Sequence, residues 1–96
     1  MSSLHTISRS PSSLLFESCC TLLQDGDGVL FIEDGIYYST QQDQARPSLP
    51  EIKLYCLRED AIARGMLERK SADIETIDYQ GFVQLCCEYD KVISWF

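Results

Sequence analysis

Cysteine is the only plausible nucleophile type in this sequence, and four of its five thiols come in adjacent pairs. The cysteines are Cys19, Cys20, Cys56, Cys86 and Cys87. A thiolate can attack the outer sulfur of a persulfide, provided that the thiol is accessible and its pKa is lowered. C-x-x-C spacing is missing and His5 is the only histidine, so we expect no structural metal site.

The helical pattern around the first pair distinguishes its two thiols. On a helical wheel, Cys19 falls with Leu15, Leu22 and Leu23 near the middle of the apolar stripe. Cys20 falls at the edge of that stripe. Periodicity therefore predicts that Cys19 is a core residue and that Cys20 is the more accessible thiol. The other three cysteines are expected to lie mainly in the core, where free thiols are usually inert.

The remaining candidate groups have ordinary structural interpretations. Glu33 and Asp34 follow an expected strand, at the end where sites of α/β proteins gather, but a turn before Gly35 explains the pair as well. His5 is interpreted as a hydrogen-bonded structural residue rather than a base. Trp95 is expected either in the core or in a subunit interface. The sequence has no phosphate-binding glycine fingerprint, and we expect no cofactor.

Short apolar runs alternate with helical patterns along the chain, and together they define the elements that must position these groups. Strands are expected at residues 4–7, 29–32, 52–57, 74–77 and 92–96. Helices are expected at about 11–23, 59–64 and 78–89, with one or two turns at 36–40 and a polar loop at 41–50. This alternation predicts a small three-layer α/β fold with a mainly parallel five-stranded sheet and right-handed crossovers.

Length and charge restrict the partners. The 96 residues allow a single domain spanning 1–96, and such a small chain buries only about 60–65% of its unfolded surface. Partner subunits are therefore expected to complete the burial. The net charge of -7 argues against direct nucleic acid binding. The absence of a secretory signal or a long apolar stretch predicts a cytoplasmic protein without a membrane segment and with reduced thiols.

A series of short motifs along nearly the whole chain resembles the DsrH/TusB family of sulfur-relay proteins. The motifs are Leu4-His5-Thr6-Ile7, Arg9-Ser10-Pro11, Glu33-Asp34-Gly35-Ile36, the segment from Leu57 to Gly65, the segment from Ile77 to Val83, and Trp95. Each motif is weak alone, but the series occurs in the family's order and with little change in spacing. The resemblance implies the DsrEFH-like version of the predicted fold.

The resemblance also implies a function and a set of partners. Proteins of this family assemble with DsrE/TusD-type and DsrF/TusC-type subunits into a heterohexamer. That complex passes persulfide sulfur to a DsrC/TusE-type acceptor, either for 2-thiolation of the tRNA wobble uridine or for sulfur oxidation. The principal sulfur-carrying cysteine lies on the DsrE/TusD-type subunit. The resemblance therefore implies an accessory subunit that is not expected to be catalytic alone.

Within the family, DsrH-type chains carry a cysteine on the first helix that many TusB-type chains lack. The string Glu17-Ser18-Cys19 matches that neighbourhood, which makes Cys19 the candidate sulfur carrier and places the chain closer to the DsrH type. A slip of one residue would assign Cys20, which stays the alternative. Because a mid-helix thiol beside Glu17 gains neither access nor a lowered pKa, a purely structural assembly or docking subunit without thiol chemistry stays the second hypothesis.

Overall fold

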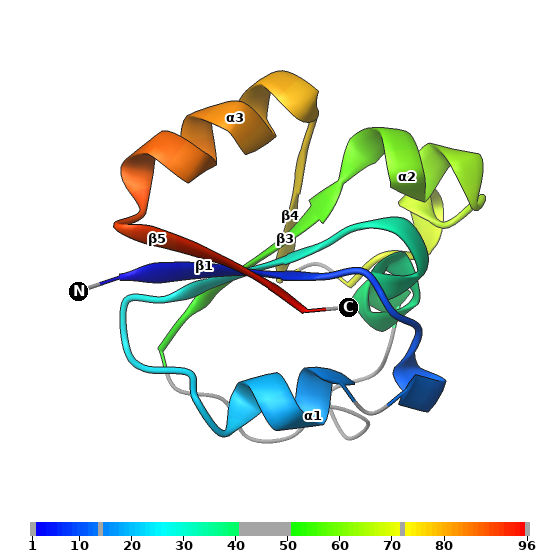
Figure 1. Cartoon of the computed structure of the whole chain (residues 1–96). Coiled ribbons are helices and arrows are strands. Elements are labelled where there is room, and N and C mark those ends of the chain that lie inside the picture. The colour runs from blue at the N-terminus through cyan, green and yellow to red at the C-terminus, as the bar shows by residue number, and fades with distance from the viewer. Residues whose placement is uncertain (1, 14, 41–50, 72, 96) are drawn as a thin grey trace.

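The computed structural model describes residues 2–13, 15–40, 51–71 and 73–95, and its centre is a parallel sheet (Figure 1). The sheet has five strands in the order β4-β3-β2-β1-β5, and every neighbouring pair is parallel. The strands are β1 (Ser3–Ile7), β2 (Gly28–Phe31), β3 (Lys53–Leu57), β4 (Ile74–Ile77) and β5 (Lys91–Trp95). The predicted α/β fold with a mainly parallel five-stranded sheet is confirmed.

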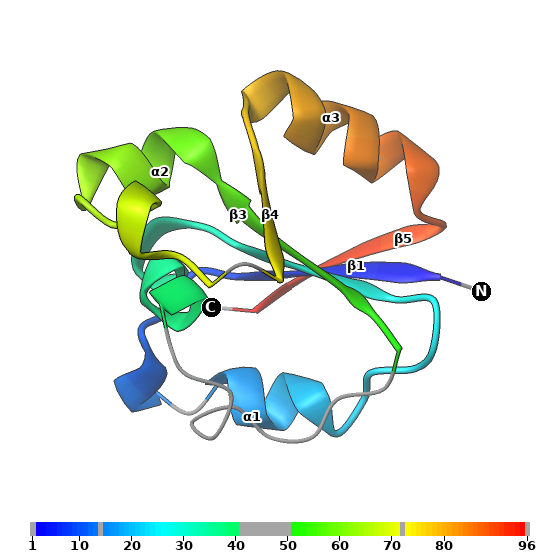
Figure 2. The same ribbon diagram turned by 180° about the vertical axis from the view of Figure 1, so that it is seen from behind.

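Short helices connect the strands and form the two outer layers. The α-helices are α1 (Leu15–Cys20), α2 (Arg58–Ala63) and α3 (Tyr79–Glu88), and the 3-10 helices are η1 (Pro11–Ser13), η2 (Glu33–Thr40) and η4 (Leu67–Arg69). Figures 1 and 2 show α1 and α3 on opposite faces of the sheet. Ala61, the buried residue of α2, belongs to the same apolar cluster as Phe16 of α1, so α2 packs with α1 rather than with α3. Among the described residues, no helix is long and apolar enough to cross a bilayer.

The direction of each crossover explains this layering. The chain moves one way across the sheet from β1 to β2 and back the other way from β4 to β5. Because both crossovers are right-handed in nearly all proteins, a reversal of direction moves the connecting helix to the opposite face. The α1 and α3 helices must therefore cover opposite faces, and the central strands between them are buried on both sides.

Two apolar clusters fill the space between the layers. The larger cluster lies on the face covered by α1, and its buried members include Ile7, Phe16, Val29, Phe31, Tyr38 and Cys56. The smaller cluster lies on the opposite face and contains Leu4, Leu30, Tyr55 and Leu85. Burial of Val29, Leu30 and Phe31 together explains why β2 is an unbroken apolar run rather than an alternating one.

Aromatic contacts attach α1 to the sheet. The ring of Phe16 on α1 lies edge-on to Phe31 of β2 and to Tyr38 of η2, with centroid distances of 5.3 Å and 4.8 Å. The rings of Phe31 and Tyr38 stack on each other at 5.5 Å. This three-ring cluster determines how deeply α1 is seated, and with it the depth of the thiols on that helix.

The first helix is shorter than its apolar pattern predicts. Instead of one helix over 11–23, the 3-10 helix η1 precedes α1, which ends at Cys20. The N–H groups of Thr21 and Leu22 donate to the carbonyl oxygens of Ser18 and Cys19, three residues back, so the chain tightens into a turn. That turn rotates Leu22 into solvent, where it is 58% exposed, and its predicted place in the apolar stripe is wrong.

Other predicted helix ends are confirmed. The carboxylate of Asp78 caps α3 by accepting a hydrogen bond of 2.8 Å from the N–H of Gly81. Gly65 follows α2 with a φ of 67°, in the left-handed region that glycine adopts at helix ends. The predicted loop at 41–50 lies outside the described residues, as does residue 96 of the predicted last strand.

The chain packs tightly against β1 where it leaves β2. The N–H of Ile32 donates to the carbonyl oxygen of Ile7 at 3.0 Å, and Glu33 has a φ of 49°, which is unusual for a residue with a side chain. This bend brings Gly35 against the same carbonyl, so that a Cβ atom on Gly35 would overlap the oxygen of Ile7. A glycine is therefore required at position 35.

We expect Gly35→Ala to lower the free energy of unfolding by at least about 2 kcal/mol, because the obstructing atom belongs to the backbone of β1 and cannot rotate away. Urea denaturation followed by circular dichroism measures the change. Gly28→Ala is the matched control, since its new methyl group would meet the hydroxyl end of the Tyr89 side chain, which can move. Equal losses in both variants would contradict the assignment.

Candidate functional site

The candidate sulfur carrier Cys19 lies inside the protein. Its side chain has no exposed surface and packs in the larger apolar cluster, on the face of the sheet that α1 covers. Burial raises the pKa of the Cys19 thiol to about 12, with smaller contributions from Cys20 and from the negative charge of Asp27. The predicted core position of Cys19 is confirmed, and its role as a sulfur carrier stays a prediction.

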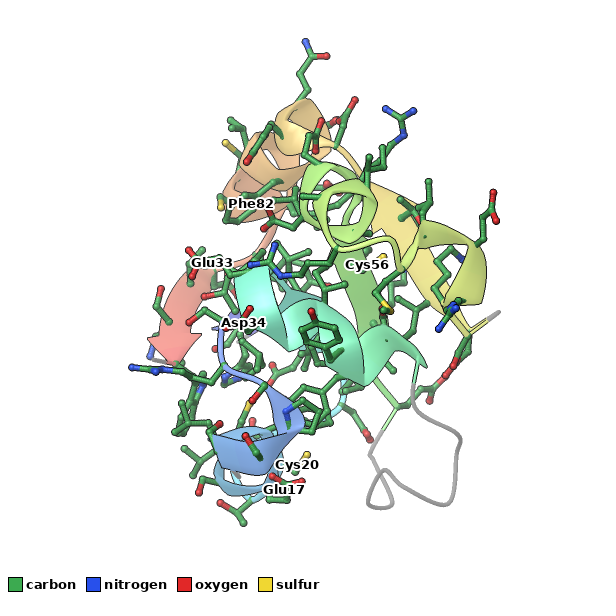
Figure 3. All side chains as sticks on the ribbon, turned by 90° about the vertical axis from the view of Figure 1, so that its right-hand side faces the viewer. Glu17, Cys20, Glu33, Asp34, Cys56 and Phe82 are labelled. Atoms are coloured by element: carbon green, nitrogen blue, oxygen red, sulfur yellow. The ribbon has the colours of Figure 1, made fainter. Side chains whose placement is uncertain are left out.

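The alternative carrier Cys20 is the last residue of α1 and is half-buried, as the helical pattern predicts. Burial, followed by the nearby carboxylate of Glu17, raises the pKa of the Cys20 thiol to about 11. Figure 3 shows Glu17 and Cys20 next to each other on α1. Glu17 also accepts a long hydrogen bond of 3.4 Å from the hydroxyl of Tyr38, which holds the carboxylate near the thiol.

The electrostatics of α1 disfavour a thiolate at both positions. Both thiols sit in the last turn of α1, at the helix end where the backbone dipoles carry partial negative charge, which disfavours the negative charge of a thiolate. Because the pKa of the Cys20 thiol is raised to about 11, this thiol is almost entirely protonated at pH 7. In the described conformation, therefore, neither thiol has the lowered pKa that a sulfur acceptor needs.

The other three cysteines differ in exposure. Cys56 on β3 is buried, and its sulfur lies 3.7 Å from the hydroxyl oxygen of Thr76, so its predicted core position is confirmed. Cys86 on α3 is half-buried, and burial raises the pKa of its thiol. Cys87 is exposed, which makes the core prediction wrong for this residue. The reason is that Leu85 and half-buried Cys86 pack toward the cluster beneath α3, which leaves Cys87 facing outward.

His5 is buried and structural, as interpreted from the sequence. Its Nδ1 atom accepts a hydrogen bond of 3.1 Å from the indole Nε1–H of Trp95, which assigns the ring proton to Nε2. Nε2 lies 3.5 Å from the carboxylate of Asp27. Asp27 is itself held by the N–H groups of Ser3 and Gln24. The resulting chain of contacts links β5, β1 and the start of β2 on the α1 face of the sheet.

Sequence reasoning missed Asp27, which the pattern placed only in a helix-ending turn. The available signal was its position directly before the first residue of β2, since a polar group there can reach the start of β1. The sequence predicts Trp95 either in the core or in a subunit interface, and the structure places it half-buried on the α1 face, where its indole N–H donates to His5. The link between these residues depends on parallel pairing of β5 with β1.

The carboxylate pair at the end of β2 acts as a turn. The backbone N–H of Glu33 donates to a carboxylate oxygen of Asp60 at 2.7 Å, and Asp34 pairs with the guanidinium of Arg64 at 3.2 Å. Both side chains of the pair are exposed, and Figure 3 shows them on the surface beside each other. These contacts tie η2 to α2, which supports the turn interpretation of Glu33 and Asp34.

A cleft of about 570 Å³ opens at the opposite end of the sheet, next to the amino-terminal ends of the strands. Its lining includes Asp25, Glu51 and Glu88, with the hydroxyl-bearing rings of Tyr55 and Tyr89. Sites of parallel α/β proteins gather at the carboxyl ends of strands instead. Within the described residues, no group of three or more His, Cys, Asp or Glu side chains is arranged to hold a metal ion.

The fold and the thiols define a class: a small doubly wound α/β protein with a thiol pair on its first helix. A family model described as "DsrH like protein" matches residues 9–92. Protein TusB of Escherichia coli O81 (strain ED1a) is 39% identical over 94 residues, which cover 96% of this chain and 99% of that protein. Protein TusB of Shigella dysenteriae serotype 1 (strain Sd197) is 38% identical over the same length.

The chain belongs to the DsrH/TusB family of sulfur-relay proteins. The resemblance derived from the short motifs is thereby confirmed. The solution NMR structure of protein Tm0979 from Thermotoga maritima has a TM-score of 0.70 to this chain and covers 90% of this chain and 92% of that one. At 19% identity, this likeness supports the shared fold alone.

Thiol labelling checks the order of exposure. At pH 7.5 we expect iodoacetamide to modify Cys87 first, Cys20 more slowly and Cys19 last, because labelling requires both access and a thiolate. Since the pKa of Cys20 is raised to about 11, its labelling rate should rise about tenfold for each pH unit between pH 7 and 9. Mass spectrometry of timed digests measures each site.

The labelling control is the protein unfolded in urea, where the sites should react at similar rates. Labelling of native Cys19 as fast as Cys87 would show that Cys19 is not protected by burial.

The link between Trp95 and His5 can be measured with a double-mutant cycle. Trp95→Phe keeps an aromatic ring but leaves Nδ1 of His5 without its donor, so we expect a loss of about 1–2 kcal/mol in the free energy of unfolding. In the background of His5→Leu, the same change should cost less by about 0.5–1.5 kcal/mol. Purely additive losses in urea denaturation would refute the hydrogen bond.

Proposed function

We propose that this protein is the DsrH/TusB-type subunit of a cytoplasmic sulfur-relay complex, in which it serves assembly and docking rather than carrying sulfur. The partners are a DsrE/TusD-type and a DsrF/TusC-type subunit in a heterohexamer, and the complex passes persulfide sulfur to a DsrC/TusE-type acceptor. The chain contributes a single domain over residues 1–96. Family membership supports the complex as a whole.

One observation supports the structural role above the others. Cys19, the thiol at the family's first-helix position, is completely buried, and its pKa is raised to about 12. Persulfide transfer to Cys19 would require its Sγ thiolate to attack the outer sulfur of a donor persulfide, forming one S–S bond while the donor sulfur leaves as a thiolate. Such an attack needs an approach along the S–S axis that the packing around Cys19 does not leave open in this conformation.

The end use that we propose is 2-thiolation of the tRNA wobble uridine. The support is that the relatives 38–39% identical over nearly the full chain are named TusB. The net charge of -7 fits an indirect role, because the chain itself would repel the phosphates of tRNA. Sulfur reaches the RNA through the acceptor instead.

The carrier role of Cys19, with Cys20 as alternative, is the second candidate function. The thiol pair on α1 favours it, because a first-helix cysteine is the feature that resembles DsrH-type chains. Half-burial leaves Cys20 reachable if α1 shifts. DsrH-type chains serve sulfur oxidation, so a carrier thiol would also favour that end use.

Genetic complementation distinguishes the two roles. In a host lacking this gene, we expect the wild type and the double variant Cys19→Ser/Cys20→Ser to restore 2-thiouridine to the same level, because the thiols do not carry sulfur. Nucleoside mass spectrometry of total tRNA measures the modification. Cys56→Ser is the matched control for replacing another buried thiol.

Loss of 2-thiouridine in the double variant, with the complex still assembled, would establish the carrier role instead. A host whose 2-thiouridine does not depend on the gene would reject the proposed end use.

A further inference from the structure

Exposed apolar side chains gather at one edge of the molecule. Four of the seven large hydrophobic side chains exposed in the described part of the chain lie in α3 and β5: Tyr79 and Val83, then Val92 and Ile93. Val83 is 65% exposed and Val92 is 43% exposed. Cys87, one helical turn after Val83, is exposed as well. These five residues are called the α3–β5 surface below.

Three of the five side chains lie on one face of α3. Tyr79, Val83 and Cys87 are spaced four residues apart, so they lie on one face of α3. Phe82, which is half-buried, packs against the cluster that contains Leu4 and thereby connects this stripe to the sheet. Figure 3 shows Phe82 at the base of α3, on the side where β5 lies.

Strand register extends the surface onto β5. Val92 of the edge strand β5 pairs with Leu4 of β1, which is fully buried. The side chain of Val92 therefore lies beside that of Leu4, on the same face of the sheet and one strand closer to its edge. Ile93 pairs with His5 and points to the other face of the sheet. A chain added beside β5 would therefore contact apolar side chains on both faces.

The two edge strands of the sheet, β4 and β5, differ in how well they are protected from pairing with another strand. On β4, the ammonium group of Lys70 donates to the carbonyl oxygen of Ile74 at 2.8 Å, and Glu75 stands exposed in the strand. Lysine, charge and short length are the devices by which natural proteins protect a sheet edge from pairing. The β5 edge has a charge only at Lys91, and its next four residues have none. Among the described strands, β5 pairs with β1 alone, so its outer edge is open to pairing with another strand.

Charge identifies the kind of partner. Asp78, Glu88 and Asp90 lie at the ends of α3 and before β5, and Lys91 is the only basic residue among them. A second copy of the chain would bring the same acidic rim and a further net charge of -7. A partner with an apolar centre and a rim of Lys and Arg fits better, because opposite charges lower the cost of approach.

We propose that the α3–β5 surface docks a different protein chain, which pairs an apolar strand with β5 and brings basic side chains to the acidic rim. This inference deepens the proposed function, because it specifies the face through which the subunit meets an assembly partner. Backbone pairing provides affinity in this mode, and the side chains of Val83 and Val92 provide specificity.

The test uses the full chain coexpressed with the DsrE/TusD-type and DsrF/TusC-type subunits of its own host. We expect Val83→Glu and Val92→Glu each to weaken assembly at least about tenfold, because each places an unpaired charge in an apolar contact. Ile62→Glu is the matched control, since Ile62 is 50% exposed on α2 outside this surface, and it should change affinity less than about twofold. Native mass spectrometry of a dilution series measures the affinity.

A second measurement reports strand pairing directly. Amide hydrogen exchange of residues 91–95 should slow in the wild-type complex relative to the free chain, because a new strand protects these N–H groups. Circular dichroism and urea midpoints verify that the variants fold. If Val92→Glu disturbs β5, the more exposed Val83→Glu decides the question.

Three results would overturn the inference. Undiminished assembly of both glutamate variants would refute the surface and leave the proposed function standing. A wild-type homodimer that Val92→Glu abolishes would make a second copy the occupant. Failure of the wild type to assemble with either subunit would reject the proposed function together with this partner.

Discussion

A parallel sheet must be covered on both faces, and this requirement organises the whole protein. The strands β1, β2 and β3 are almost entirely buried, so the chain has to supply cover on both faces of the sheet. In a chain of 96 residues the coverage comes from short helices, of which α3, with ten residues, is the longest described α-helix. The three-ring cluster around Phe16 and the close approach of Gly35 to Ile7 both hold this thin covering against the sheet.

The same requirement determines the state of the thiols. Because α1 is only six residues long, almost every side chain on its inward face is needed for packing, and Cys19 is one of them. Packing and thiol chemistry therefore compete for a single side chain. The burial that stabilises α1 also raises the pKa of the Cys19 thiol. The first-helix cysteine of the family pattern can therefore serve packing alone, without a reactive thiol.

Coverage decreases toward one edge of the sheet, and this asymmetry relates the fold to assembly. The β4 edge is closed by Lys70 and by the charge of Glu75, whereas α3 extends over β5 only in part. Val92 and Val83 stay exposed as a result. A subunit that completes its burial against a partner is a physically reasonable solution for a chain too small to cover its own sheet.

The sequence by itself determined the fold class, because alternating apolar runs and helical patterns leave few arrangements other than a parallel sheet with crossover helices. It also determined the cap at Asp78, the end of α2 at Gly65 and the family, through motifs spread over nearly the whole chain. Only the tertiary structure decided where α1 ends, that Leu22 and Cys87 face solvent, and that Asp27, His5 and Trp95 meet. These features depend on contacts between segments distant in sequence, and local periodicity carries no information about such contacts.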